Sequence, residues 1–171
     1  LKFRDNYDVL LQRLKKCGME NIFECEPFKT YAINSNTNIT IFPSDEGWID
    51  SSACIEHDGY VIYHGNDNYV SPATFKEIAK KFQVDIAFLP YAGFSGFPAS
   101  YEFSQEVKLK FAKKKKIEAV DEFFTSIDAL KPKIAIPAAG DLCLVSEDQA
   151  WINYYDRCSP DEVVEKEKTH C

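Results

Sequence analysis

The sequence predicts an α/β fold in which helices flank a mixed β-sheet. Two segments carry this prediction: residues 91–98, which read YAGFSGFP, and residues 131–141, which read KPKIAIPAAGD. Each segment is a short apolar run that stops at a glycine-rich or proline-rich turn. Buried strands of α/β sheets end in this way where they lead into functional loops. One long helical pattern separates the two segments, and mainly antiparallel strand patterns precede them, which suits a single layered structure.

The first part of the chain is expected to hold one helix and several short strands. Apolar residues at helical spacing between Tyr7 and Cys17 predict a helix that Gly18 stops. Turn residues then separate three runs with β-type composition. These runs cover residues 22–25, 30–33 and 38–42.

The pair Asp58-Gly59 is the strongest hairpin signal in the chain. It joins predicted strands at residues 53–57 and 60–64. The second of these strands therefore leads directly into a polar loop at residues 64–68, where functional side chains are expected.

The second part of the chain alternates helices and buried strands. Ser71 is a predicted N-cap and Pro72 a first helical residue, followed by an apolar helical stripe. The later elements are predicted as a strand at residues 84–89, a helix at 104–130, a strand at 133–137 and short helices at 151–155 and 160–167.

Composition excludes several classes of function. The net charge of −7 argues against a nucleic-acid or anionic-membrane surface, and the basic run at residues 113–116 is expected to be a solvated helix face. No apolar stretch long enough to span a membrane is present. Six cysteines without C-x-x-C spacing, and no signal-peptide pattern after Leu1, favour reduced thiols in a cytoplasmic protein. The early helix suits a chain that begins inside a domain.

Asp67 is the first candidate for a metal ligand. It follows a predicted buried strand, in a turn that contains glycine, so the strand would hold its carboxylate rigidly. His64 and Asn66 lie beside it as further candidates for the surroundings of the site. The alternative is an Asx-turn aspartate, a common use of this residue after a strand.

Other carboxylates could join such a site. Glu46 and Asp50 lie ahead of the hairpin, together with Asp45, and could add hard metal ligands, although a solvated loop explains them equally well. Asp141 lies after the last predicted strand, where it could be a site residue or a helix cap.

The glycine-rich aromatic loop at residues 91–101 could shape a pocket for a small-molecule substrate. It matches neither the phosphate-loop nor the dinucleotide pattern, and its serine lacks the context of a hydrolase nucleophile. No catalytic residue is assigned. The candidate substrate-binding residues are Tyr91, Gly93, Ser95, Gly96 and Phe97.

Residues 50–67, 91–98 and 130–140 together resemble the metallo-β-lactamase-like domain of the CMP-N-acetylneuraminate hydroxylase group. The likeness covers roughly residues 5–156. It implies a four-layer αββα sandwich with a zinc or iron site between two sheets, and it makes Asp67 the metal-ligand aspartate. A sugar-like or nucleotide-like substrate is implied by the same analogy.

The chain lacks the His-x-His-x-Asp-His motif that supplies the principal ligands in that superfamily, and none of its three histidines are two residues apart. We therefore expect residues 1–156 to be the C-terminal half of one such domain, and residues 157–171 to form a short helix and a polar tail. The intact parent would be a metal-dependent hydroxylase or other oxidoreductase, or a hydrolase. The chain alone would be inactive and bind no metal, and its uncovered sheet face would favour self-association or a partner chain. The alternative is a non-catalytic binding module, or a subunit that completes the sandwich with a partner.

Overall fold

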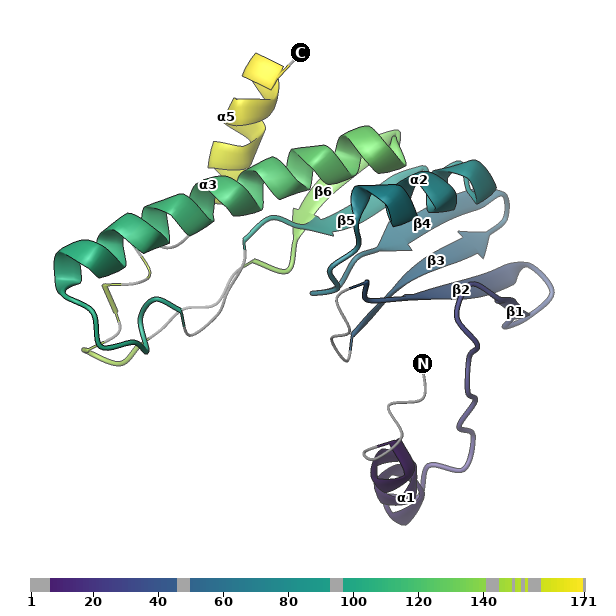
Figure 1. Ribbon diagram of the computed structural model, residues 1–171. Coiled ribbons are helices and arrows are strands. Elements are labelled where there is room, and N and C mark those ends of the chain that lie inside the picture. Colours follow the sequence, from purple (N-terminus) through teal and green to yellow (C-terminus); the bar gives the residue numbers. More distant parts are fainter. Residues whose placement is uncertain are drawn as a thin grey trace.

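A computed structural model describes residues 7–45, 50–92, 97–140, 145–148, 150–151, 153 and 158–170. Its core element is one mixed sheet of six strands whose spatial order follows the chain (Figure 1). The first three strand pairs are antiparallel and the last two are parallel, which confirms the predicted mixed sheet. The strands are β1 (Thr30–Ala32), β2 (Thr37–Pro43), β3 (Ser51–His57), β4 (Tyr60–His64), β5 (Ile86–Pro90) and β6 (Ile134–Ala138).

Helices flank this sheet unevenly. Helices α2 and α3 lie along the same face, α5 meets α3, and α1 stands away from the sheet (Figure 1). None of the described helices has both the length and the apolar character needed to cross a membrane. The helices are α1 (Tyr7–Lys16), α2 (Pro72–Lys81), α3 (Gln105–Leu130) and α5 (Pro160–His170).

The predicted caps and turns form as expected. The Ser71 hydroxyl accepts a hydrogen bond from the Thr74 backbone N–H at 3.3 Å, and Pro72 begins α2. In the hairpin between β3 and β4, Asp58 and Gly59 have φ angles of 48° and 84°, which the tight turn requires.

One predicted element is wrong. Residues 22–25 alternate like a strand, but the structure gives them no regular conformation. Phe23 is 72% exposed and rests edge-on against Tyr31, with ring centroids 5.1 Å apart. A strand needs a neighbour that satisfies its backbone groups, and the sheet edge here is only the three-residue β1.

Charged residues link neighbouring helices and strands through hydrogen bonds and ion pairs. Asp85 accepts hydrogen bonds from the Val61 backbone N–H at 2.7 Å and from Lys133 Nζ at 2.6 Å, and the Lys133 ammonium is the main reason that its pKa lies below the usual value. Between α3 and α5, the Lys116 ammonium contacts Glu162 at 2.6 Å and lowers the pKa of that carboxyl. The basic run is therefore only partly a solvated face.

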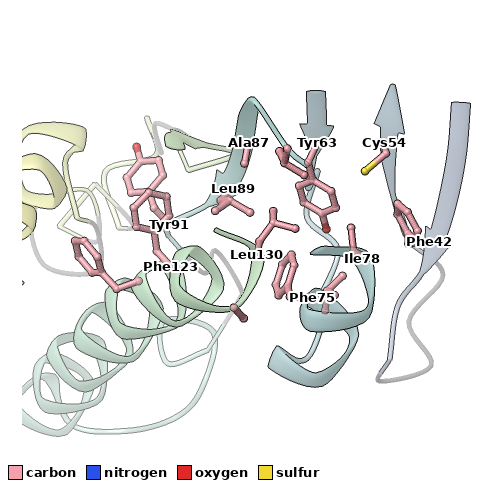
Figure 2. Packing of buried hydrophobic residues seen from close by; sticks show 14 of the residues in the cluster. Phe42, Cys54, Tyr63, Phe75, Ile78, Ala87, Leu89, Tyr91, Phe123 and Leu130 are labelled. Atoms are coloured by element: carbon pink, nitrogen blue, oxygen red, sulfur yellow. The ribbon is translucent and has the colours of Figure 1, made fainter. Parts of the chain in front are cut away.

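The hydrophobic core lies between the sheet and helices α2 and α3 (Figure 2). Tyr63 on β4 and Phe75 on α2 meet with ring centroids 5.6 Å apart, and Phe42 meets Phe82 at 6.0 Å. Leu89 on β5 is fully buried in the same layer. Burial of these large side chains is the main stabilising contribution to the fold.

The opposite sheet face carries a row of apolar side chains, which we call the isoleucine row. Strand register places one such residue of each strand side by side, and cross-strand partners share a face. None of the six is buried, and Ile134 is 55% exposed. This face is therefore open in the described part of the chain. The row consists of Tyr31, Ile39, Ile55, Ile62, Ile86 and Ile134.

Candidate functional site

The turn after β4 is held tightly against the end of β5. The Gly65 backbone N–H donates to the Phe88 carbonyl at 2.8 Å, and the Asn68 N–H donates back to the Gly65 carbonyl at 3.1 Å. A Cβ atom at Gly65 would lie 2.9 Å from that Phe88 oxygen. The glycine is needed for close approach, and it fixes the path of the residues that follow.

Asp67 is exposed on this turn. Within the described residues, no hydrogen bond or ion pair engages its carboxylate. The Asx-turn explanation requires that the side chain bind the backbone nearby, and such a bond is absent from the described contacts. The carboxylate is therefore available to an external group.

His64 ends β4 beside Asp67 and is also exposed. Its Nδ1 accepts a hydrogen bond from the Asn66 backbone N–H at 3.2 Å, and its ring lies 5.8 Å from that of Phe88. Because that bond uses the Nδ1 lone pair, the neutral ring carries its proton on Nε2. In this geometry His64 can donate a hydrogen bond outward, but it offers no lone pair to a metal.

Asn66 ties the turn to the start of β3. Its backbone has a positive φ of 53°, and its side-chain Nδ2 donates to Asp50 Oδ1 at 2.8 Å. The same oxygen accepts from the Ser51 N–H at 2.7 Å. The structure thus gathers Asp50, His64, Asn66 and Asp67 at one edge of the sheet.

Asp45, the other carboxylate candidate that the structure describes, does not join them. Asp45 accepts hydrogen bonds from the Ser71 N–H at 2.7 Å and from Thr74 Oγ1 at 3.1 Å, so it supports the start of α2. Partial burial alone would raise the pKa of Asp45, but these hydrogen bonds outweigh it and hold the pKa below its usual value. Glu46 and Asp141 lie outside the described residues.

A cavity of about 460 Å³ opens beside Asp67, between the turn after β4, the start of α2, the end of β5 and the middle of α3. Tyr91, one of the predicted substrate-binding residues, lines it and is 3% exposed. A Cβ atom at Gly140 would lie 2.3 Å from the Tyr91 ring, so Gly140 leaves room for that ring.

Of the other loop residues that were predicted to bind substrate, Phe97 alone lies among the described residues. Phe97 is not among the described lining residues of this cavity. It packs against Tyr101, Phe103 and Phe111, with centroid distances of 5.3, 6.3 and 5.1 Å. Phe97 thus belongs to an aromatic cluster, and its role in substrate binding stays a prediction. Gly93, Ser95 and Gly96 lie outside the described residues.

Sequence reasoning missed most of the cavity wall. Tyr63 and Asn68 line it from the sheet side, and Glu122, Thr125 and Ser126 line it from α3. The three α3 residues lie within one helical turn of one another, which is the only sequence signal that could have grouped them. Nothing in the sequence pairs that helix face with the turn after β4.

The described residues do not make a complete metal site. No group of three or more histidine, cysteine, aspartate or glutamate side chains converges in the part of the chain that the structure describes. A zinc site needs three or four protein ligands, so Asp67 alone does not suffice.

The comparisons with known proteins identify the fold. No family model matches the chain, and no curated protein matches its sequence. It is similar to the structure of Igni18, a metallo hydrolase from the hyperthermophilic archaeon Ignicoccus hospitalis, with a TM-score of 0.59 and 15% identity. That match covers 96% of this chain and 59% of Igni18, so the chain spans little more than half of that protein's length.

A second similar structure is the CmlA beta-hydroxylase E377D mutant, with a TM-score of 0.47, 15% identity, and coverage of 72% of this chain and 27% of that chain. The chain has the metallo-β-lactamase-like α/β fold, as predicted. The described residues form one six-stranded sheet, with helices α2 and α3 on one face.

Proposed function

We propose that this chain supplies Asp67 as one metal ligand to a metal-dependent enzyme with the metallo-β-lactamase-like fold. The observation that carries the proposal is the geometry of Asp67: an exposed carboxylate without a described partner, on a turn fixed by Gly65 at the end of a rigid strand. Ligands positioned by rigid elements in this way need little reorganisation when a metal binds.

The metal in this proposal is zinc or iron, and the remaining ligands come from residues outside the described set. His64 and Asn66 support the Asp67 ligand without binding the metal themselves. His64 can donate a hydrogen bond through Nε2, and Asn66 connects the turn to Asp50. Because the described residues hold no complete site, we assign them no catalytic step. The chain by itself is expected to be inactive.

Two reaction classes are compatible with this role. Similarity to the metallo hydrolase Igni18 supports hydrolysis, whereas the sequence resemblance to the CMP-N-acetylneuraminate hydroxylase group supports oxygenation. The substrate is a small molecule bound in the adjacent cavity.

Metal analysis tests the proposal in two steps. The chain alone, titrated with zinc or iron(II), should bind less than one tight equivalent, because it supplies too few ligands. When a polypeptide that carries a His-x-His-x-Asp-His motif is supplied, joined to the chain or in trans, one or two equivalents should bind.

In that completed protein, Asp67→Asn should lower the metal content while the circular dichroism spectrum stays unchanged. Asp58→Asn is the matched control, since Asp58 lies on the hairpin turn and is also exposed. Unchanged metal stoichiometry in Asp67→Asn would exclude its role as a ligand.

The isoleucine row favours a second function, that of a subunit whose open sheet face packs on a sheet of a partner chain. Two apolar sheet faces can pack about 10 Å apart and form a dry interior. Sedimentation should then show association that Ile55→Lys abolishes. A chain that stays monomeric with its wild-type sequence, at high concentration and with candidate partners present, would rule out this function.

A further inference from the structure

Asp67 is a central residue of the four-residue turn at residues 65–68. The Asn68 backbone N–H donates to the Gly65 carbonyl at 3.1 Å and closes this turn, so Asn66 and Asp67 are its two middle residues. Asn66 has a φ of 53°, a left-handed conformation that asparagine adopts more readily than most residues. Among the described contacts Asp67 makes no hydrogen bond of its own. Its position therefore depends on the residues on either side of it.

The Asn68 side chain anchors one end of the turn to two strands. Asn68 is 4% exposed, and its Nδ2 donates to the Phe42 carbonyl at 3.2 Å and to Ser52 Oγ at 3.1 Å. Phe42 and Ser52 lie opposite each other in the register of β2 and β3. A carbonyl oxygen only accepts hydrogen bonds, so the amide nitrogen must face Phe42. One nitrogen atom thus connects the turn to both strands.

The anchor continues into the hydrophobic core. Ser52 is 2% exposed, and it also forms a hydrogen bond with the Tyr63 hydroxyl. Burial raises the pKa of that hydroxyl, and the bond with Ser52 opposes the rise. At the other end of the turn, Gly65 donates to the Phe88 carbonyl on β5 at 2.8 Å. Strands β2, β3 and β5 therefore hold the turn from both of its ends.

Stability alone gives no reason for an amide at this position. Asn68 Oδ1 is buried and has no hydrogen-bond partner among the described residues. A buried oxygen without a partner opposes folding. Departures from the rule that buried polar groups are paired need an explanation, and they are common at functional sites. The part of the Asn68 side chain that is used is the nitrogen that fixes the turn.

We propose that Asn68, with Ser52 as its buried partner, is a positioning residue that holds Asp67 in place for a metal. The proposal rests on the proposed function in one respect, that the group positioned is a metal ligand. Asn68 itself does not touch the metal. It acts by keeping the turn in one conformation before the metal binds, so that binding needs little reorganisation of the chain.

Nitrogen-15 relaxation of the chain alone tests the anchor without any metal. The order parameter of the Asp67 backbone N–H should be about 0.85 in the wild type, as in rigid backbone, and should fall below about 0.6 in Asn68→Ala. Ser52→Ala keeps the bond to the Phe42 carbonyl and should give an intermediate value, which also carries the test if Asn68→Ala does not fold. A wild-type value below about 0.6, or an unchanged value in the variants, would overturn the proposal.

Ile78→Val is the control for a general loss of stability. Ile78 is 2% exposed on α2, and it takes no part in the described hydrogen bonds of the turn. Removal of its methyl group should lower the free energy of unfolding and leave the Asp67 order parameter unchanged. Equal loosening of the turn in Ile78→Val and Asn68→Ala would show that the turn only follows overall stability, against a positioning role.

Metal binding by the completed protein provides the second readout. Asn68→Ala should raise the metal dissociation constant about 10- to 100-fold, the usual effect of residues that orient a ligand, while the stoichiometry at saturating metal stays the same. An unchanged dissociation constant would overturn the positioning role and leave the metal proposal intact. Unchanged stoichiometry in Asp67→Asn would instead refute the metal proposal, whatever the order parameters show, so the two failures are distinguishable.

Discussion

Strand β5 provides a direct test of the open sheet face, because it places Ile86 on that face and Leu89 in the core. Leu89 is fully buried, whereas Ile86 in the isoleucine row keeps contact with solvent. Truncation of either residue to alanine removes three carbon groups from the same short strand. The two variants therefore share their chemistry and differ in the environment of the side chain.

The expected costs follow from burial. Three buried groups at about 0.8 kcal/mol each give roughly 2.4 kcal/mol for Leu89→Ala, and the cavity left behind raises this to about 3–4 kcal/mol. Ile86 loses only about half of the transfer free energy and leaves no closed cavity, so Ile86→Ala should cost about 1–1.5 kcal/mol. The predicted difference is about 2 kcal/mol.

Urea denaturation, followed by far-ultraviolet circular dichroism at several protein concentrations, measures both changes in the free energy of unfolding. Equal costs for Ile86→Ala and Leu89→Ala in a monomeric protein would refute the assignment of an open face. A cost for Ile86→Ala that grows with protein concentration would show instead that another copy or a partner covers it.

Two further predictions concern the fold around the site. Hydrogen bonds hold the pKa values of Asp45, Asp85 and Glu162 below their ordinary values. The contribution of these carboxylates to stability should therefore be complete above the unfolded values of 3.8 and 4.5, and it should be lost as the pH falls through the lower folded values. Thermal melts between pH 7 and pH 2 measure this loss, and a melting midpoint that stays constant through the acid range would contradict it. Gly65→Ala places a Cβ atom 2.9 Å from the Phe88 carbonyl oxygen and should lower the free energy of unfolding by about 1–3 kcal/mol. The amide chemical shifts of the turn after β4 should change as well. Unchanged stability and unchanged shifts would show that the turn tolerates a side chain.

The sequence was a good guide to local structure. The cap at Ser71, the hairpin at Asp58-Gly59 and the helix that ends near Leu130 are all where local chemistry predicts them. Each depends on residues close together in the chain, and such signals can be read from one sequence.

The candidate site was less accessible to prediction. Asp67 and Tyr91 were expected as site residues, and the structure brings both to one cavity, although their roles stay predictions. Asn68 lies in the polar loop at residues 64–68 that the sequence indicated, but it was not singled out there. The α3 wall was missed because its proximity to that loop depends on how α3 crosses the sheet. Residues 22–25 show the opposite failure, since their alternation favours a strand but no long neighbouring strand exists to pair with them.

The sequential strand order has a consequence for folding. Each strand pairs with its neighbour in the chain, so β1 to β4 can assemble through short loops, each with a small entropy cost of closure. The parallel pairs need longer connections: helix α2 lies between β4 and β5, and the step from β5 to β6 must wait for the long helix α3 to close over the core. The sheet can therefore grow outward from the β3–β4 hairpin, and the two parallel pairs, which need helical crossovers, form after the antiparallel ones.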